Sequence, residues 1–162
     1  MAQIYISLGT NSGKRLQNIQ LAVKKLKDVI LIEKISSPYL TQPVEIKGGW
    51  FINCVVGGQT EKEPLQLLKH LLQIEKEMGR VRGKKEKRTI DLDILFFEEK
   101  IIKMENLTIP HPRAHQRRFV LVPLAEINPH LKHPLLKKNI QVILNELQDL
   151  SKVEKVETTI TN

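Results

Sequence analysis

Cysteine is almost absent from this 162-residue chain, in which Cys54 stands alone. A single cysteine excludes an internal disulfide and a zinc cluster built from thiolates. The chain also has no apolar run approaching the ~18 residues of a membrane span. Its first residues, MAQIYISLGTN, lack the basic stretch and the long apolar region of a signal peptide. Together these absences predict a cytoplasmic protein.

Aromatic residues are also scarce, at 4% of the chain. This scarcity disfavours a binder of single-stranded nucleic acid, because such proteins stack bases on aromatic side chains. The net charge of +8 nevertheless suits an anionic partner, either nucleic acid, a phosphate-bearing ligand or an acidic surface. The basic excess is partly concentrated in RVRGKKEKR, residues 80–88. This run is either a solvated loop, a segment that contacts nucleic acid, or a segment that binds the phosphates of a ligand.

The composition is that of a globular protein, with 41% hydrophobic and 27% charged residues, and the length favours a single domain over residues 1–162. The hydrophobic pattern predicts strands near 4–8, 29–36, 50–60 and 90–97, and helices near 16–26, 64–78 and 140–150. The order β-α-β-β-α-β is typical of an α+β ferredoxin-like sandwich, an antiparallel sheet with helices on one face. About 60 C-terminal residues must extend this sheet or pack beside it, and the tail after about residue 151 need not be ordered.

The second predicted helix begins with a capping signal. Thr60 and Glu63 have the spacing of a capping box, and Pro64 suits a first helical turn. The apolar stripe of this helix is expected to comprise Leu65, Leu68, Leu72 and Met78. Glu75 lies close to that stripe, so it is either a boundary residue or an acid aimed at a site.

The stretch GTNSGKR, residues 9–15, resembles a phosphate-binding loop without matching it. A P-loop needs four residues between its glycines and Ser or Thr after the lysine. Here three residues separate Gly9 from Gly13, and Arg15 follows Lys14. We therefore predict a tight strand-to-helix turn.

The stretch RTIDLDILFF, residues 88–97, reads as a buried strand that carries two acids. Side chains alternate along a strand, so Asp91 and Asp93 are expected on one face with Cα atoms about 6.6 Å apart. Leu95 and Phe97 are expected to share that face, and Ile90, Leu92, Ile94 and Phe96 the other. Two like charges on one face repel, and Mg²⁺ ions would compensate because they bind carboxylate and phosphate oxygens. The alternative is an edge strand with two solvated acids.

A third cluster, TIPHPRAHQRRF, occupies residues 108–119. His111 lies between two prolines, which stiffen its backbone, and Arg117 follows shortly after. His111 and His115 have the spacing of a zinc pair on a helix, but Pro112 and the missing third ligand oppose that interpretation. A structural His-Pro turn and a histidine that faces phosphate both remain open.

Three clusters, in this order, resemble the 6-hydroxymethyl-7,8-dihydropterin pyrophosphokinase family of folate synthesis. They are the basic run at residues 80–88, the acidic strand at 88–97 and the histidine-containing stretch at 108–119. The matching motifs span about residues 4–125 and are SLGTN, SPYLTQP, FIN, GRVR, RTIDLDIL, LTIPHPR and RRFVLVPL. The resemblance implies that ATP gives its terminal pyrophosphate to the hydroxymethyl group of the pterin and that AMP leaves. It implies these two small molecules as substrates, with no nucleic acid or membrane as partner. The alternative is a basic ferredoxin-like module that binds RNA without catalysis.

The resemblance also implies roles for individual residues. Asp91 and Asp93 match ligands of two Mg²⁺ ions, while Arg80 and Arg88 match arginines that hold the phosphates during transfer. The expected ATP contacts are Glu75, Arg82, Ile94, Thr108, His111 and Arg117. The expected pterin contacts are Thr41, Val44, Phe51, Asn53 and Phe119. A flat, hydrogen-bonding bicycle suits an aromatic ring on each face and an amide on one edge. Without the resemblance, both phenylalanines would be read as core.

Overall fold

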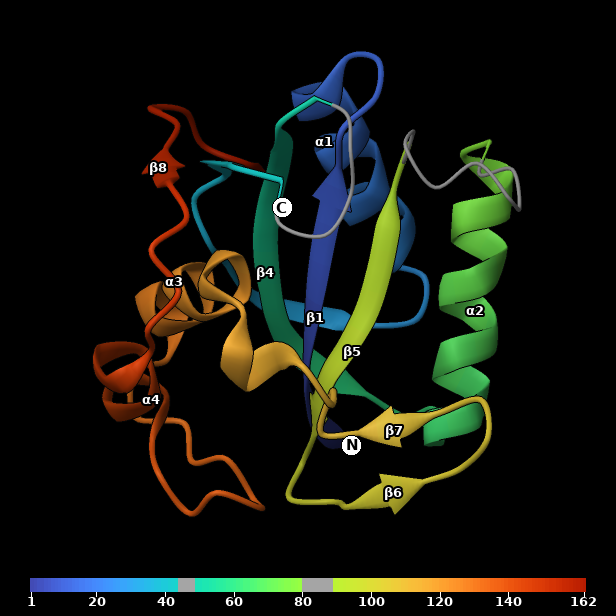
Figure 1. Cartoon of the computed structure of the whole chain (residues 1–162). Coiled ribbons are helices and arrows are strands. Elements are labelled where there is room, and N and C mark those ends of the chain that lie inside the picture. The colour runs from blue at the N-terminus through green and yellow to red at the C-terminus, as the bar shows by residue number, and fades with distance from the viewer. Residues whose placement is uncertain (44–48, 80–88) are drawn as a thin grey trace.

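The computed structural model describes residues 1–43, 49–79 and 89–162. Its main sheet is antiparallel, with the strand order β5-β1-β4-β3-β8 and with β2 also paired to β4 (Figure 1). The strands of this sheet are β1 (Ala2–Thr10), β2 (Leu31–Ile35), β3 (Tyr39–Thr41), β4 (Phe51–Thr60), β5 (Asp91–Phe97) and β8 (Val153–Lys155). The α-helices are α1 (Arg15–Leu26), α2 (Pro64–Glu77), α3 (Arg118–Ile127) and α4 (Ile140–Glu146).

The order β1-α1-β2-β4-α2-β5 is the predicted ferredoxin-like arrangement, which is thereby confirmed. Strand β3 was not expected, because it lies in the stretch that the sequence marks as a loop, and β6 (Ile102–Lys103), β7 (Thr108–Ile109) and β8 were not predicted either. The three residues of β3 pair with Phe51–Asn53 of β4 on one side and with β8 on the other. Proline-flanked residues therefore still add a short strand when the sheet offers partners on both edges.

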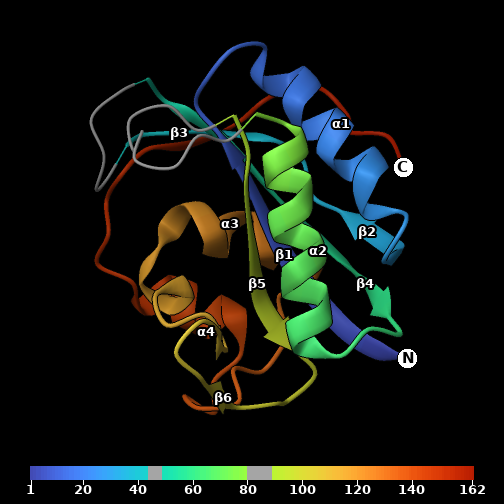
Figure 2. The same ribbon diagram turned by 90° about the vertical axis from the view of Figure 1, so that its right-hand side faces the viewer.

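Helices cover both faces of the sheet, which corrects the expectation of helices on one face. In Figure 2 the helices α1 and α3 lie on opposite sides of the strands. One core joins the side chains of α1 and α2 to one face, including Ile19, Leu26 and Leu71. A second core joins α3 and α4 to the other face, including Leu121 and Ile143. The C-terminal residues were predicted to extend the sheet or to pack beside it, and both occur. Strand β8 extends the sheet, while α3 and α4 pack beside it.

A bulge in β5 changes which residues share a face. Tyr5 pairs with Phe96 and Ile6 pairs with Ile94, so Leu95 is an extra residue in β5. Up to Leu95 the predicted alternation holds. Beyond it the prediction was wrong, because Phe96 joins the α3 core and Phe97 joins the α1–α2 core. The inserted residue reverses the side-chain alternation for the rest of the strand.

Helix α2 begins with a capping box one turn later than predicted. Its cap is Glu63, whose side chain accepts from the backbone of Gln66, while the Gln66 side chain accepts from the backbone N–H of Glu63 at 3.1 Å. Thr60 instead donates to the carbonyl of Val29 at 2.8 Å. The buried stripe also differs from the prediction. It comprises Pro64, Leu67, Leu71, Ile74 and Glu75, whereas Leu65 and Leu72 are 44% and 54% exposed.

The remaining elements are small. Strands β6 (Ile102–Lys103) and β7 (Thr108–Ile109) form a separate hairpin, and a 3₁₀ turn at Ala114–Gln116 precedes α3. Helix α4 is shorter than predicted, because Leu147 already has an extended backbone. Within the described ranges, no helix is both long and apolar enough to cross a membrane.

Candidate active site

Three strands place polar groups in one row across the sheet. Gly9 of β1 pairs with Asn53 of β4 on one side and with Asp91 of β5 on the other. Directly paired residues of antiparallel strands point to the same face. That face is the one covered further along by α3, because Tyr5, Val55 and Leu95 of these strands belong to the α3 core. The sheet therefore carries an amide and a carboxylate side by side, with a glycine between them.

Gly9 leaves open the space between these two polar side chains. A Cβ atom at this position would lie 2.5 Å from Asn53 Oδ1 and 3.7 Å from Phe51 Cδ2. The sequence pattern ended the strand at Leu8, so this role was missed, although a glycine inside a strand is a signal of close approach. The predicted tight turn follows at Gly13, whose φ is +70°.

Asn53 and Thr41 form a buried polar pair beside Gly9. Asn53 Nδ2 donates to Thr41 Oγ1 at 2.6 Å, and the two residues are 7% and 1% exposed. The pairing of β3 with β4 brings these two predicted pterin contacts together, with Phe51 opposite Thr41. Because Asn53 Nδ2 already donates to Thr41, its Oδ1 is the atom that faces the space beside Gly9.

Asp91 and Asp93 lie on the α3 face of β5, as the alternation predicted. Asp91 is half-buried and Asp93 is exposed. Asp93 pairs with Ser7, which precedes Gly9 by two residues in β1, so Asp93 lies on the same face as Asp91 but in the next row of side chains. No group of three or more His, Cys, Asp or Glu residues converges within 1–43, 49–79 and 89–162. Two carboxylates still fit Mg²⁺, which keeps several waters and binds substrate phosphates in addition to one or two carboxylates.

Three of the predicted ATP contacts, Glu75, Thr108 and His111, lie along the edge of β5 that faces away from β1. Glu75 of α2 is 5% exposed, and its Oε2 accepts from Leu92 N at 2.8 Å. Further along this strand His111 N donates to the Leu95 carbonyl at 3.0 Å. Thr108 lies on β7, which also contacts β5. Glu75 therefore satisfies a backbone donor located between the two aspartates in sequence, a contact that no sequence pattern indicates.

Ile94 occupies a different environment from the other predicted ATP contacts. Its side chain is 5% exposed and belongs to the core beneath α1 and α2. The N–H of Leu92 points to the free edge of the sheet, and alternate residues of a strand point their backbone groups the same way. A contact of Ile94 with nucleotide would therefore come from its backbone.

The start of α3 supplies the aromatic side of the site. Phe119 is half-buried against the α3 core, and the Cζ atom of Arg117 lies 5.5 Å from the centroid of its ring. This is the distance of a cation–π contact. Arg117 and Phe119, predicted for ATP and pterin respectively, thus lie within one turn of each other at the beginning of one helix.

His111 and His115 do not share a role as a ligand pair. His111 Nδ1 accepts from Arg113 N at 3.2 Å, so in the neutral ring the proton resides on Nε2. The His115 ring instead packs edge-on against His133, with 5.7 Å between ring centroids.

Cys54 is fully buried, which raises the pKa of its thiol to about 12 and keeps it protonated at neutral pH.

Four of the predicted site residues lie outside the described residues. They are Val44, Arg80, Arg82 and Arg88. Their predicted roles as pterin, phosphate and ATP contacts stay predictions.

Comparisons with known proteins identify the family of this chain. The family model described as "7,8-dihydro-6-hydroxymethylpterin-pyrophosphokinase (HPPK)" matches residues 5–129. The chain belongs to the HPPK family. It is accordingly an ATP-dependent pyrophosphokinase of folate biosynthesis. The comparisons do not support an RNA-binding module.

Relatives of similar length share this family. A "2-amino-4-hydroxy-6-hydroxymethyldihydropteridine pyrophosphokinase" of Aquifex aeolicus is 38% identical over 143 residues, covering 87% of this chain and 89% of that protein. The protein of the same description from Bacillus subtilis is 43% identical over 127 residues, covering 76% of each chain.

The family also occurs within longer proteins. This chain is 43% identical over 149 residues to "Folic acid synthesis protein fol1" of Pneumocystis carinii and spans a fifth (20%) of its length. A crystal structure of HPPK-DHPS from Plasmodium falciparum superposes with a TM-score of 0.75 and 19% identity, over 90% of this chain and 45% of that one. The latter similarity concerns the fold alone.

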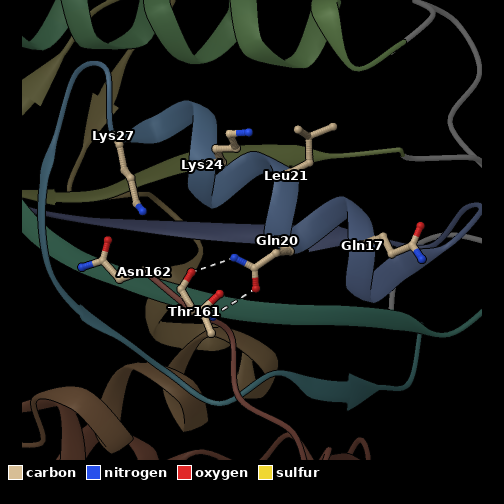
Figure 3. A pocket seen from close by; sticks show the side chains of 7 residues that line it. All are labelled: Gln17, Gln20, Leu21, Lys24, Lys27, Thr161 and Asn162. Atoms are coloured by element: carbon tan, nitrogen blue, oxygen red, sulfur yellow. Dashed lines mark hydrogen bonds between the residues drawn. The ribbon is translucent and has the colours of Figure 1, made fainter.

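A surface hollow of about 470 Å³ lies elsewhere on this HPPK-family chain. It is formed by the outer side of α1 and the last residues, as Figure 3 shows. Helix α1 covers the face of the sheet opposite to Asp91 and Asn53, so this hollow is not part of the candidate active site. Its lining residues are Gln17, Gln20, Leu21, Lys24, Lys27, Thr161 and Asn162.

Proposed function

We propose that the chain transfers pyrophosphate from ATP to the hydroxymethyl group of 6-hydroxymethyl-7,8-dihydropterin at the row formed by Asp91, Gly9 and Asn53. In this proposal the pterin lies against Asn53, Thr41 and Phe51, and ATP lies along the free edge of β5. The reaction yields AMP and the pterin diphosphate. It requires no covalent intermediate on the protein, because positioning and charge neutralisation account for phosphoryl-type transfer.

One observation carries this proposal: the amide and the carboxylate share one face, two strands apart, with a glycine between them. Neighbouring strands are ~4.8 Å apart, so the backbones of Asn53 and Asp91 are separated by about 10 Å. A flat bicycle bound edge-on to Asn53 can therefore extend over Gly9 and bring its substituent close to Asp91.

We propose that Asp91 and Asp93 hold two Mg²⁺ ions. Two carboxylates on one face would otherwise repel, and their residue type suits a hard cation. Bound Mg²⁺ would neutralise the triphosphate and favour attack at the β-phosphorus. The single exposed carboxylate of the pair, Asp93, is accessible to a metal that arrives with ATP.

The remaining residues bind and orient the two substrates. The Nε2–H of neutral His111 suits an anionic oxygen, and the Arg117 guanidinium suits phosphate. Asn53 Oδ1 accepts from the pterin edge, while Phe51 and Phe119 offer faces for the bicycle. Arg80 and Arg88 flank the basic run and would hold the phosphates during transfer, a role that rests on the sequence.

We also infer that the reaction takes place in the cytoplasm and involves no nucleic acid. The single buried cysteine supports a reducing compartment. The low aromatic content supports the exclusion of single-stranded nucleic acid.

The test is AMP formation from ATP, measured with and without the hydroxymethyl pterin, for Asp91→Ala and Asp93→Ala. Each variant should lose at least ~10²-fold in turnover, because each removes a metal ligand. Pterin-dependent AMP formation by the unaltered chain should require Mg²⁺.

Asp28→Ala is the matched control, since Asp28 is an exposed acid at the end of α1. Its turnover should equal that of the unaltered chain. Turnover within threefold of the unaltered value in either Asp91→Ala or Asp93→Ala would refute the proposed metal site.

A further inference from the structure

A short C-terminal segment joins the two walls of the proposed pterin site. This connecting segment, residues 149–155, follows α4 and ends with β8, and Figure 1 shows the chain passing α3 on its way to the sheet. It lies outside the region matched by the family, residues 5–129. One wall is the start of α3 with Phe119, and the other is β3 with Thr41.

At one end the connecting segment holds the first residue of α3. Asp149 Oδ2 accepts from the backbone N–H of Arg118 at 3.2 Å, and Arg118 Nη1 donates to the Ser151 carbonyl at 3.3 Å. The first N–H groups of a helix have no partner within the helix, and a carboxylate is favoured there by the helix dipole. Helix α3 has no cap from its own N-cap side chain. Asp149 therefore supplies a cap from a distant part of the chain, at the residue between Arg117 and Phe119.

Asp149 is itself held in a fixed orientation. Its Oδ1 accepts from Ser151 N at 2.8 Å and from Ser151 Oγ at 2.6 Å. Partial burial acts to raise the pKa of Asp149, but the hydrogen bonds from Ser151 and Arg118 outweigh it, and the pKa lies below its ordinary value. The carboxylate is thus ionised and pre-oriented when it meets α3.

At its other end the connecting segment is part of the sheet. The N–H of Gln42 donates to the Lys152 carbonyl at 3.0 Å, and Lys152 N donates to Gln42 Oε1 at 3.1 Å. Val153 then pairs with Thr41, the residue that accepts from Asn53. Only a few residues therefore separate the contact with α3 from the contact with the pterin wall of β3.

The chain beyond β8 is anchored on the opposite face of the sheet. Ile160 is buried in the α1–α2 core at 7% exposure. In Figure 3 the Gln20 amide donates to the Thr161 carbonyl at 2.7 Å and accepts from Thr161 N at 3.0 Å. The connecting segment is consequently anchored on its C-terminal side, which allows it to fix the position of the α3 residue that it contacts.

We propose that Asp149 is a positioning residue for the pterin site: through Arg118 and β8 it sets the separation between Phe119 on α3 and Thr41 on β3. This inference rests on the proposed function, because it takes Phe119, Thr41 and Asn53 as pterin contacts. A bicycle held between two walls binds well only at one wall separation, and a misplacement of about 1 Å is enough to reduce activity strongly.

The test compares Asp149→Ala with Asn139→Ala. Asn139 caps α4 through Oδ1, which accepts from Val142 N at 2.9 Å, so both variants remove one helix cap. Asp149→Ala also removes the two hydrogen bonds from Ser151, so its loss of thermal stability should be the larger of the two. The KM for pterin should rise about fivefold to tenfold in Asp149→Ala only. This fold-change corresponds to the free energy of one lost helix cap. A pterin KM in Asp149→Ala within twofold of that in Asn139→Ala would overturn the proposal.

A double-mutant comparison tests whether Asp149 acts through Phe119. If it does, adding Asp149→Ala to Phe119→Ala should change the pterin KM by less than about twofold, because the group that Asp149 positions is already gone. A full, independent increase in the double variant would overturn the proposed route. Ser151→Ala removes one of the two hydrogen bonds that orient Asp149 and leaves the Arg118 contact in place, so it should raise the pterin KM less than Asp149→Ala does; an equally large effect would count against the cap.

Asn53→Ala separates a failure of this inference from a failure of the proposed function. If Asn53→Ala raises the pterin KM and Asp149→Ala does not, the pterin site stands and the positioning role is wrong. If neither variant changes the pterin KM, both the site assignment and the inference built on it are refuted.

Discussion

Gly9 separates Asn53 from Asp91 in the sheet, and a methyl group there would enter the space between them. A Cβ 2.5 Å from Asn53 Oδ1 is closer than atoms approach without a shift, so the amide would have to move. Asn53 is held by Thr41 and is 7% exposed, which leaves little room for that shift. At this position the absence of a side chain is itself part of the proposed site.

If Asn53 Oδ1 accepts from the pterin edge as proposed, Gly9→Ala should raise the KM for pterin by at least about tenfold, because the displaced amide would lose that hydrogen bond. The KM for ATP should change much less. Steady-state kinetics with each substrate varied in turn measures both values.

Gly57→Ala is the matched control for this substitution. Gly57 also lies on the β1–β4 pair, and a Cβ there would lie 2.9 Å from Tyr5 Cε1, far along the strand from Asn53. It should reduce stability without altering the pterin KM. An equal rise of the pterin KM in both glycine variants would show that general strain, and not the space beside Asn53, is responsible.

At the scale of elements, α3 is tied to β3 a second time through Glu126. Its carboxylate accepts from Ser37 N at 2.9 Å, from Ser37 Oγ at 3.0 Å and from the Tyr39 hydroxyl at 2.6 Å. Burial and, next, the hydrogen bond to Glu126 raise the pKa of Tyr39 above its ordinary value, so its hydroxyl remains a donor. Helix and strand are therefore joined near both ends of α3, by Glu126 and by the connecting segment.

Glu126→Ala should lower the free energy of unfolding by about 1–3 kcal/mol, because the 7%-exposed Tyr39 loses the acceptor for its hydroxyl. Glu126→Gln keeps an acceptor and should lose less. Urea denaturation measures both. Glu146→Ala, which removes the exposed ion pair between Glu146 of α4 and Lys138 before this helix, should cost at most about 1 kcal/mol. A loss in Glu126→Ala no larger than in Glu146→Ala would contradict the tie.

At the scale of the whole molecule, His133 makes stability depend on pH. It is 3% exposed, its Nδ1 accepts from Leu135 N at 3.2 Å and Leu136 N at 3.1 Å, and its ring packs against Phe96. Burial, and secondarily the nearby His115, lowers the pKa of His133 below 6.5. The unfolded chain then binds a proton at higher pH than the folded chain. We therefore expect the contribution of His133 to the free energy of unfolding to be fully present above about pH 6.5. This contribution decreases as the pH falls from there towards the pKa of His133 in the folded chain.

His133→Asn should reduce this pH dependence. Asparagine offers an acceptor for the same two N–H groups but does not titrate in this range. Between pH 7 and 5 the unaltered chain should lose up to about 1.4 kcal/mol more stability per pH unit than the variant. Urea denaturation at several pH values gives both curves, and parallel curves would show that His133 is not the group responsible.

Several features of the site follow from local patterns in the sequence. The alternation of strand side chains places Asp91 and Asp93 on one face, and it does so because a period of two depends only on the backbone between them. The ferredoxin-like order follows in the same way from short apolar stretches and helical spacing. Pro64 marks the first turn of α2 because its missing N–H has no partner at that position anyway.

Other features were decided by contacts between distant residues. Two leucine stripes of α2 are nearly equivalent in sequence, and packing chose Leu67 and Leu71 over Leu65 and Leu72. The bulge at Leu95 arises from the pairing with β1, 90 residues earlier in the chain, so no local pattern in β5 reveals it.

The sequence by itself determined the family, the reaction and the carboxylate pair, because these are carried by short motifs, each made of residues close together in the chain. Only the tertiary structure decided that Gly9 lies between Asn53 and Asp91, that Glu75 binds the backbone of β5, and that Asp149 caps α3. Each of these depends on the register of strands or on the docking of a helix, and register is set by the total burial of apolar side chains across the whole sheet.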